Sequence, residues 1–316
     1  MEKQLTLIID KIINEIGQVQ VLGDDKKVIT DVTADSRVVE NGSLFICLKG
    51  ATVDGHKFLK MAVEKGAVAA LVEDVPEEIP AGVTLLVVPD TRKAMEAVVP
   101  FFFDYPGKNM RMLGITGTNG KTTTTNIIRT VLRQAGYKVG LIGTINIMIE
   151  DEAVEAHNTT PDVVDLQKAL FAMKNAGCDY VVMEVSSHAL VLNRVAGCEY
   201  DCAVLSNITQ DHLDFHKTLE NYRDAKSLLF EGLANGVKEN KNAVFNMDDA
   251  SSEIIKARTK VNCLTYGKEH TNDIYPSSFN VQAKEMQLKL ATPVGEMDLN
   301  LKITGEFNVY NVMSAV

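Results

Sequence analysis

The sequence predicts an α/β protein with two domains, a small N-terminal α/β domain and a larger domain built on a mostly parallel sheet. Three observations lead to this fold class. Short apolar runs alternate with helical periodicity along most of the 316 residues. A glycine-rich loop at residues 114–123 joins one such run to an amphipathic helix. A turn-rich segment at residues 105–109 separates the two regions, so the predicted domains are residues 1–107 and 108–316.

The first predicted domain has the pattern of a small α/β unit. Apolar residues at helical spacing predict helices over residues 5–16, 56–65 and 92–103. Short apolar runs predict strands at residues 28–32, 43–48, 67–72 and 84–88. Asp35, Ser36 and Arg37 form a polar loop between two of these strands. Such a loop can bind a ligand, but it is more often plain surface, so the residues alone leave both readings open.

Strand and helix patterns alternate through the second predicted domain. Apolar runs predict strands at residues 110–113, 138–145, 180–185, 201–206, 243–246 and 261–266. Helical spacing predicts helices over residues 124–135, 163–175 and 219–233. The alternation indicates a mostly parallel sheet with helices on both faces and ligands at the carboxyl ends of the strands. Residues 275–303 have the pattern of a β-meander, and residues 305–316 that of the start of a helix.

The glycine-rich loop has the layout of a phosphate-binding loop. Glycines between a strand and a helix let backbone N–H groups converge on an anion, and the helix N-terminus adds partial positive charge. Lys121 would reach the outer phosphates, and the Thr122 hydroxyl would hold Mg²⁺. Ile115 stands where the usual pattern has glycine. The alternative is a glycine-rich turn that carries a solvated lysine.

The composition excludes several classes of partner. The net charge is −10 and no basic block occurs, which argues against nucleic acid. No apolar run approaches the roughly 18 residues that span a bilayer, so membrane insertion is not expected. The five cysteines are odd in number and none forms a Cys-x-x-Cys pair, which favours reduced, packed thiols over a metal pair. We therefore expect a cytoplasmic protein, and a monomer.

Two further polar features follow predicted strands. Glu184 ends an apolar run, where a carboxylate is costly unless it is paired or binds a metal. In a phosphate-loop fold, an acid at a neighbouring strand end is the expected Mg²⁺ partner, although a surface glutamate is the alternative. Residues 211–216 gather two carboxylates and two imidazoles, including His212, a density that suits metal binding or proton transfer. Taken singly, each histidine would more often be structural.

Lys226 has an unusual place on its predicted helix. The inward apolar stripe of this helix consists of Leu219, Tyr222, Leu229, Phe230 and Leu233. Lys226 lies on the same stripe. A desolvated lysine tends to lose its proton, and a neutral amine can react with CO₂ to form a carbamate that acts as a Mg²⁺ ligand. Periodicity alone favours the other reading, in which the stem extends so that the charge reaches solvent.

Taken together, the motifs resemble those of the Mur ligase family. The matching stretches are residues 35–37, 117–123, 158–161, 184–188, 207–212 and 222–229. They occur in this order along the whole chain. The resemblance implies a UDP-binding N-terminal domain, a central P-loop ATPase domain, and a C-terminal Rossmann-like domain that would follow Val316 and is absent from this sequence. We therefore expect a fragment that does not turn over by itself.

The resemblance also implies roles for individual residues. ATP phosphates would be held by Gly117, Thr118, Asn119, Gly120, Lys121, Thr122 and Thr123, and adenine by Asn308 and Asn311. The muramoyl-dipeptide would be bound by Asn158, Thr159, Thr160, Ser186 and Arg194, and its uridine end by Ser36. The Mg²⁺ ligands would be Thr122, Glu184, His212 and Lys226, the last as a carbamate formed with CO₂. Lys121, His212 and Lys226 would be the catalytic residues.

The implied reaction is ATP-driven amide ligation in peptidoglycan synthesis, and hence a role in cell shape and division. The match is nearest to members that add a diamino acid, meso-diaminopimelate or L-lysine, to UDP-N-acetylmuramoyl-L-alanyl-D-glutamate through an acyl phosphate. Four alternatives stay open: another Mur ligase, a folylpolyglutamate synthase, a non-catalytic nucleotide-binding module and a phosphotransferase. The loop at residues 35–37 disfavours the folate enzyme.

Overall fold

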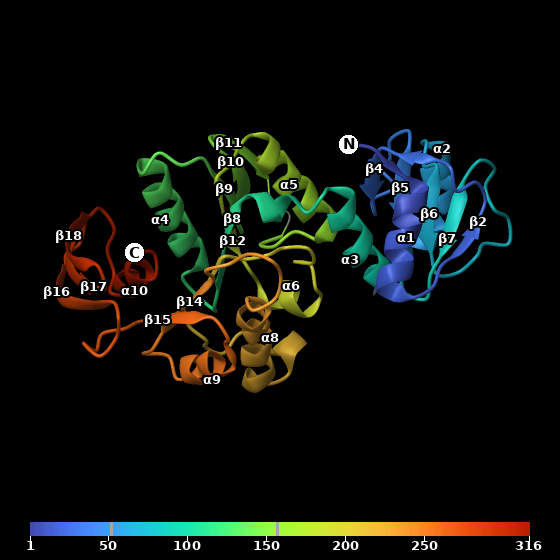
Figure 1. Ribbon diagram of the computed structural model, residues 1–316. Helices are drawn as coiled ribbons and strands as arrows, with labels where there is room; N and C mark the ends of the chain where they lie inside the picture. The colour runs from blue at the N-terminus through green and yellow to red at the C-terminus, as the bar shows by residue number, and fades with distance from the viewer. Residues whose placement is uncertain (51–52, 156–157) are drawn as a thin grey trace. The chain divides into compact units, whose positions relative to one another are not determined.

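The computed structural model describes residues 1–50, 53–155 and 158–316 of the chain. Its secondary structure alternates between helices and strands, and the chain divides into two compact units (Figure 1). The first unit comprises Met1–Pro106, Asp162–Phe171 and Val195–Gly197. The second comprises Gly107–Pro161, Ala172–Arg194 and Cys198–Val316. None of the helices in the described ranges is long and apolar enough to cross a membrane.

The first unit is built around a five-stranded sheet with the order β2-β7-β6-β5-β4. Its strands are β2 (Gln20–Leu22), β4 (Asp31–Thr33), β5 (Ser43–Ile46), β6 (Ala69–Val72) and β7 (Thr84–Val87). Strands β4 to β7 are parallel to their neighbours, and β2 is antiparallel to β7. A short pair, β1 (Lys3–Gln4) and β3 (Val28–Ile29), lies outside this sheet.

Successive residues of these strands face opposite sides of the sheet, which gives the first unit two cores. Leu44 and Ile46 pack in one core with α1 (Leu5–Ile16) and α3 (Thr91–Phe102). Phe45 packs in the other with α2 (Leu59–Glu64), which follows a short 3₁₀ turn, η1 (Gly55–Phe58). The sheet is therefore covered on both faces, as expected for a parallel arrangement.

The second unit contains an eight-stranded sheet with the order β11-β10-β9-β12-β8-β13-β14-β15. The parallel strands are β8 (Arg111–Thr116), β9 (Val139–Ile142), β12 (Tyr180–Glu184), β13 (Cys202–Leu205), β14 (Asn242–Asn246) and β15 (Asn262–Tyr266). The edge is a hairpin of β10 (Asn146–Ile149) and β11 (Glu152–Glu155), antiparallel to β9. This largely parallel sheet confirms the predicted α/β class.

Helices cover both faces of the eight-stranded sheet. On one face, α4 (Lys121–Gln134) packs against β8, β9 and β12. On the other, Leu229 of α8 (Leu219–Gly232) lies against Gly114 of β8. Further helices that precede the C-terminal meander in the second unit are η2 (Pro106–Asn109), part of α5 (Val163–Asn175), α6 (Ser187–Val191), α7 (Leu213–His216) and α9 (Ser251–Arg258). The carboxyl ends of the central strands are left to their loops, which is where the site residues lie.

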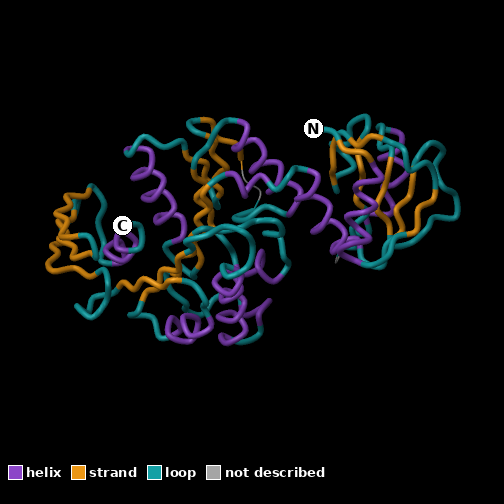
Figure 2. The backbone as a smooth tube through the Cα atoms, in the orientation of Figure 1, coloured by secondary structure: helices purple, strands orange, loops and turns teal. Residues whose placement is uncertain are grey.

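The last part of the chain forms the predicted meander followed by a helix (Figure 2). The meander consists of β16 (Tyr275–Val281), β17 (Met286–Thr292) and β18 (Gly295–Leu301), paired antiparallel. Met286, Leu288 and Leu290 share a core with Val309 and Val312 of α10 (Phe307–Met313). Because α10 also packs against α4, the chain end lies beside the helix that follows the glycine-rich loop.

Some sequence expectations need correction. The hairpin β10–β11 was not predicted, because its turn residue Glu150 takes a left-handed conformation (φ 54°) without the Gly or Asn that usually marks such a turn. Leu219 was placed on the inward stripe of its helix, but it is 41% exposed. This helix therefore buries a narrower stripe than the apolar pattern indicated.

Candidate active site

The loop between β8 and α4 needs glycine at two positions. Gly117 and Gly120 have φ values of 144° and 89°, a region that side chains rarely adopt. A Cβ on Gly117 would lie 1.9 Å from the Ser206 Oγ, and one on Gly120 would lie 2.4 Å from the Asn311 Oδ1. The loop is thus tightly enclosed, and Asn311, predicted to face adenine, packs directly against it.

The residues after β13 brace this loop. The Asn119 N–H donates to the Asn207 Oδ1 at 3.0 Å, and the Asn207 amide donates back to the Asn119 carbonyl at 3.0 Å. The Ser206 hydroxyl donates to the same carbonyl at 2.6 Å. Ser206 was not among the predicted site residues, whereas Asn207 begins the matching stretch at residues 207–212. The signal for them was the position of two hydrogen-bonding residues at the carboxyl end of a strand beside β8.

Two lysine amines meet at the loop. Lys226 of α8 is 1% exposed, and its Nζ donates to the Gly117 carbonyl at 2.9 Å. The Lys121 Nζ donates to the same carbonyl at 2.9 Å and to that of Thr118 at 2.8 Å. Burial and the nearby Lys121 charge hold the pKa of Lys226 well below its usual value. The structure therefore places Lys226 inside the fold, with a tendency to be neutral, rather than extended to solvent.

Glu184 is a buried carboxylate at the end of β12, 1% exposed. Its Oε2 accepts hydrogen bonds from the Thr122 and Thr144 hydroxyls, each at 3.0 Å, and its Oε1 accepts one from the Thr144 N–H at 3.0 Å. A Cβ on Gly143 would lie 2.5 Å from the Oε1. Glu184 and Thr122, two predicted Mg²⁺ ligands, are therefore in direct contact, and Gly143 leaves room for the carboxylate.

His212 lies near Tyr222, whose ring also faces the Lys226 amine. Its ring centroid is 6.2 Å from that of Tyr222, and the Lys226 Nζ is 4.4 Å from the same tyrosine ring. The His212 side chain is 49% exposed and its Nε2 is 3.5 Å from the Asp211 Oδ2. Its backbone is left-handed (φ 49°), which fixes the direction in which the imidazole leaves the chain.

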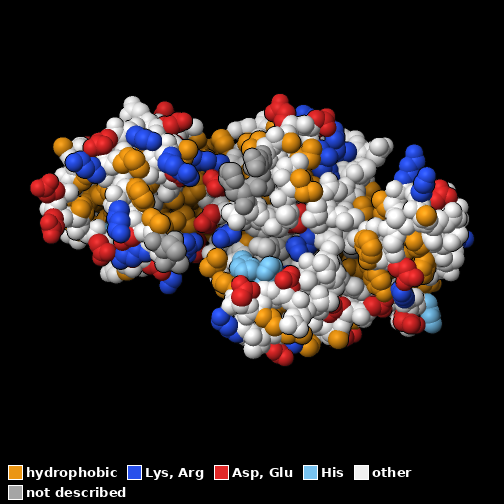
Figure 3. Space-filling model, turned by 180° about the vertical axis from the view of Figure 1, so that it is seen from behind, with side chains coloured by type: hydrophobic (Ala, Val, Ile, Leu, Met, Phe, Trp, Pro, Cys, Tyr) orange, Lys and Arg blue, Asp and Glu red, His pale blue; other side chains and the backbone are white. Residues whose placement is uncertain are grey.

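Further histidines surround His212. Its ring makes an edge contact with His188 at 4.8 Å, and His216 contacts His188 at 5.4 Å. The His216 Nε2 is 2.9 Å from the Ser187 Oγ. Burial and neighbouring positive groups lower the pKa of both His188 and His216, so these two imidazoles favour the neutral form. A small group of histidine side chains (pale blue) is visible at the surface in Figure 3.

The arrangement fits a magnesium ion only if donors beyond protein carboxylates and imidazoles take part. Across residues 1–50, 53–155 and 158–316, no group of three or more His, Cys, Asp or Glu side chains could hold a metal. Glu184 and the Thr122 hydroxyl offer the hard oxygen ligands that Mg²⁺ prefers.

Thr160 and Ser186, two of the predicted dipeptide-binding residues, lie beside Glu184. The Thr160 hydroxyl donates to the Glu184 carbonyl at 2.9 Å and accepts from the Ser186 N–H at 3.0 Å. The Arg194 Nη1 donates to the Thr160 carbonyl at 3.5 Å, and its Nε is buried without a partner in the structure. Thr159 contacts Thr144, and Asn158 is exposed. A buried, unpaired guanidinium N–H is the kind of donor that an anionic ligand would satisfy.

Two adjoining cavities open around the glycine-rich loop. One, of about 340 Å³, is lined by residues 118–123 together with Thr144, Thr159 and Glu184. The other, of about 550 Å³, is lined by Asn119, Gly120, Tyr266, Tyr310 and Asn311, among others. Asn308 lies behind Asn311, whose amide donates to the Asn308 Oδ1 at 2.8 Å. The first cavity has the size and polarity for phosphates, and the second has aromatic walls suited to a base.

Ser36 lies in the first unit, so it is described apart from the loop. It follows β4 and is 7% exposed. Its neighbours form a tight local network, in which the Arg37 guanidinium pairs with the Asp35 carboxylate at 2.7 Å and the Asp35 N–H donates to the Thr33 hydroxyl at 3.1 Å. That pairing lowers the pKa of Asp35. The predicted loop is thus an ordered turn at the carboxyl end of a parallel strand.

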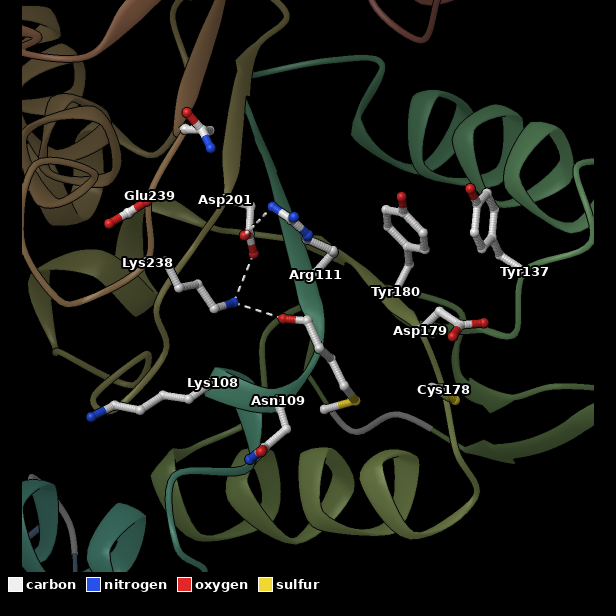
Figure 4. Close-up of a pocket in the computed structure, with 12 residues that line it drawn as sticks. Lys108, Asn109, Arg111, Tyr137, Cys178, Asp179, Tyr180, Asp201, Lys238 and Glu239 are labelled. Carbon is white, nitrogen blue, oxygen red and sulfur yellow. Dashed lines mark hydrogen bonds and ion pairs between the residues drawn. The ribbon is translucent and has the colours of Figure 1, made fainter.

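A third cavity, of about 570 Å³, lies at the opposite, amino-terminal edge of the eight-stranded sheet (Figure 4). It is lined by Lys108, Arg111, Tyr137, Tyr180, Asp201 and Lys238, among others. It contains none of the predicted site residues. In Figure 4 the Lys238 amine points at Asp201 and at a backbone carbonyl, so its charge is matched within the protein.

A strand, an enclosed glycine loop with Lys and Thr, and a following helix define a P-loop nucleotide-binding protein. Matches to models of protein families identify the family within this class. The Mur ligase middle domain matches residues 115–316, and the Mur ligase family catalytic domain matches residues 28–102. The chain belongs to the Mur ligase family.

Individual relatives agree with this assignment. The UDP-N-acetylmuramoyl-L-alanyl-D-glutamate--2,6-diaminopimelate ligase of Bacillus cereus is 46% identical over 289 residues, which is 91% of this chain and 58% of that protein. A solved structure of a ligase with the same name has a TM-score of 0.81 at 28% identity and covers 100% of this chain and 63% of its own. The MurF ligase of Thermotoga maritima in complex with ADP, at 20% identity and a TM-score of 0.66, covers 90% of this chain and 61% of its own and shares the fold. The chain thus spans about three fifths of the length of these proteins.

Proposed function

We propose that this chain carries the nucleotide and acceptor sites of an ATP-dependent amide ligase of peptidoglycan synthesis. Its substrates would be UDP-N-acetylmuramoyl-L-alanyl-D-glutamate and 2,6-diaminopimelate, the compounds in the names of its relatives, with L-lysine as the alternative diamino acid. The observation that carries the proposal is the buried Lys226 amine, which shares the Gly117 carbonyl with Lys121. A simple nucleotide-binding module has no need of a second, desolvated amine at its phosphate loop.

The two cavities at the loop would bind different parts of the nucleotide. In this proposal adenine occupies the cavity beside Asn311 and Tyr310, and the phosphates occupy the cavity formed by residues 118–123. Lys121 would exchange its bonds to the Gly117 and Thr118 carbonyls for bonds to phosphate oxygens. The loop N–H groups and the α4 N-terminus supply the remaining attraction for the anion.

Magnesium would be held by Thr122, Glu184, His212 and Lys226. In the proposed state Lys226 has lost a proton and its nitrogen has bonded to the carbon of CO₂, giving a carbamate and a released proton. When bound, the ion would neutralise charge on the phosphates as the phosphoryl group is transferred. Tyr222, whose ring lies 4.4 Å from the Lys226 Nζ, would fix the direction of the modified side chain.

The acceptor substrate would lie beside Glu184. The D-glutamate carboxylate would attack the γ-phosphorus of ATP, so that a C–O–P bond forms and ADP leaves. The amine of the diamino acid then attacks the acyl carbon, releasing phosphate and one proton. Arg194, Thr159, Thr160, Ser186 and Asn158 would orient the carboxylate end of the substrate. Alignment of the attacking oxygen is the main contribution that protein groups can make to such a transfer.

The first unit would bind the uridine end of the substrate, with residues 1–107 as the UDP-binding domain and residues 108–316 as the ATP-binding domain. Ser36 is the residue proposed to contact the nucleotide. Ser36→Ala should weaken binding of the UDP-substrate several-fold, as expected for one lost hydrogen bond of about 1 kcal/mol. Calorimetry with UDP-N-acetylmuramoyl-dipeptide measures this, and an unchanged affinity would remove Ser36 from the site. We further propose that the protein is cytoplasmic, in agreement with its five free cysteines. We also propose that it is a monomer.

The decisive experiment is trapping of the activated carboxylate. The full-length protein is incubated with ATP, Mg²⁺, UDP-N-acetylmuramoyl-dipeptide and hydroxylamine, and hydroxamate is measured against ADP. Equal amounts of the two, both dependent on the dipeptide, are the expected result. ADP formation without hydroxamate would point to transfer onto a hydroxyl and contradict the proposal. Replacing the dipeptide by folate, or by the substrates of other Mur ligases, separates the remaining members of the superfamily.

A further inference from the structure

The hairpin β10–β11 connects two parts of the candidate site. Thr144, which binds Glu184, precedes it by two residues, and the turn of Asn158, Thr159 and Thr160 follows shortly after it. The hairpin therefore lies between a residue that contacts the proposed metal ligand and the residues proposed to bind the acceptor.

At the base of the hairpin, the Thr144 hydroxyl lies close to two oxygen atoms that can accept its hydrogen bond. The Thr144 Oγ1 is 3.0 Å from the Glu184 Oε2 and 3.1 Å from the Thr159 Oγ1. A threonine hydroxyl has a single proton, so Thr144 donates to one of these oxygens at a time. Thr159 can donate in return when the proton of Thr144 is given to Glu184. The threonine pair thus links the buried carboxylate to the proposed acceptor turn.

The tip of the hairpin is held by the helix that follows the phosphate loop. Arg133 of α4 makes a two-pronged contact with Asp151, with its Nη1 2.8 Å from the Oδ1 and its Nη2 3.1 Å from the Oδ2. Arg129, one turn earlier, donates to the Glu150 carbonyl. The Arg129 Nε and the Glu150 Oε1 are both buried without a partner. Bidentate guanidinium–carboxylate pairs fix orientation as well as distance. The tip of the hairpin therefore has a defined position relative to α4.

We propose that this hairpin is a positioning element that transmits the placement of α4 to the acceptor turn. Arg129 and Arg133 hold its tip, Thr144 holds its base, and Thr159 is thereby set against Glu184. This inference rests on the proposed function, because it takes residues 158–160 as acceptor-binding residues. It predicts that nucleotide at the start of α4 and acceptor at the end of the hairpin strengthen each other's binding, in a reciprocal way.

The experiment measures the affinity of UDP-N-acetylmuramoyl-dipeptide for the full-length protein by calorimetry, with and without a non-hydrolysable ATP analogue. In the parent protein the analogue should tighten dipeptide binding about 5-fold or more, within the usual range for coupled sites. Arg133→Ala and Asp151→Ala should each bring this ratio close to one. The exchanged pair Arg133→Asp with Asp151→Arg should restore it in part. Lys289→Ala removes a comparable surface pair, 3.0 Å from Glu296 in the meander, and should leave the ratio unchanged.

The base of the hairpin is tested by a matched pair of variants. Thr144→Val keeps the shape but loses the hydroxyl, and should raise the KM for the dipeptide about tenfold while the KM for ATP changes less than twofold. Thr144→Ser, which keeps the hydroxyl, should retain most of the parent behaviour. Thermal unfolding of each variant checks that it is folded.

The outcomes separate the inference from the proposed function. A parent protein that binds both ligands, with variants whose ratios and KM values match the parent, would overturn the positioning role alone. A parent protein that binds neither the dipeptide nor the ATP analogue would overturn the proposed function and this inference with it.

Discussion

The amino-terminal and carboxyl edges of the eight-stranded sheet differ in how their buried lysine side chains are paired. At the amino-terminal edge, the Lys238 amine donates to the Asp201 carboxylate at 2.7 Å and to the carbonyls of Met110 and Glu199. Asp201 also pairs with Arg111 at 3.2 Å. At the carboxyl edge, Lys121 and Lys226 instead share one carbonyl, and the pKa of each is lowered by burial.

This difference shows which kind of evidence points to function. The cavity at the amino-terminal edge, at about 570 Å³, is at least as large as either cavity at the loop. The charges of Lys238, Asp201 and Arg111 are nevertheless paired within the protein, as in an ordinary structural network. Buried groups that repel one another, or that lack a partner, are costly and persist where a ligand or a reaction needs them. Four variants would sharpen or break this contrast.

The largest effect is expected from Lys226→Ala in the full-length protein. Loss of the amine should lower the rate of ligation by about 10³-fold or more, in the range observed for a charge-stabilising group. Added formate or acetate should restore part of the rate by supplying a carboxylate. The measurement is dipeptide-dependent ADP release. Full activity of the variant would contradict the proposed role of Lys226 as a metal ligand.

A smaller but still large effect is expected from Gly143→Ala. The new Cβ would lie 2.5 Å from the Glu184 Oε1, so the carboxylate must shift away from Thr122 and Thr144. We expect a loss of about 10²-fold in kcat/KM, as small misplacements at reacting centres can cause. Gly232→Ala in α8 is the matched control, because nothing lies within 4 Å of its added Cβ. The control should stabilise the helix by about 1 kcal/mol without loss of activity.

At the amino-terminal edge, Lys238→Ala should act on stability rather than on catalysis. Asp201 and the Glu199 carbonyl would lose a buried partner, which typically costs about 3 kcal/mol. Chemical denaturation measures this loss. The activity per folded molecule should stay within twofold of the parent. A selective loss of activity with unchanged stability would show that the two edges do not differ in the way described.

The pH dependence of stability gives the most delicate test. Because burial lowers the pKa of Lys226, the unfolded chain binds a proton there more readily than the folded chain does. This difference lowers the free energy of unfolding. The loss of stability is complete below the pKa that Lys226 has in the folded protein, and it disappears as the pH rises to the ordinary lysine value of 10.5. Lys226→Met should therefore stabilise the protein most at low pH, and progressively less towards that value. Denaturation in CO₂-free buffer measures the difference, and a pH-independent difference would argue that the amine is not destabilised.

Much of the fold and part of the site could be predicted from the sequence. The helices over residues 5–16 and 163–175 were predicted with the bounds that the structure has, because each combines a clear apolar stripe with a glycine just beyond its end. The phosphate loop was recognisable from its local pattern. Lys226 was visible as a charge on an apolar stripe, and the structure adds that its amine reaches the Gly117 carbonyl.

The remaining features depend on contacts between distant residues. Thr144 binds Glu184 across 40 residues, and Ser206 meets Asn119 across 87, so no local pattern marks either contact. Glu150 adopts a left-handed turn without glycine because Arg129 and Arg133 hold the hairpin tip from another element. The exposure of Leu219 likewise depends on how α8 meets the sheet rather than on its periodicity.

The bonds of Lys121 to its own loop have a consequence for ligand entry. The ammonium group already has two oxygen acceptors, the carbonyls of Gly117 and Thr118. An incoming phosphate therefore competes with the backbone for this cation, and the energy gained is that of an exchange rather than of a new bond. In the proposed ligase, this exchange would weaken nucleotide binding and would favour release of the spent nucleotide after each turnover.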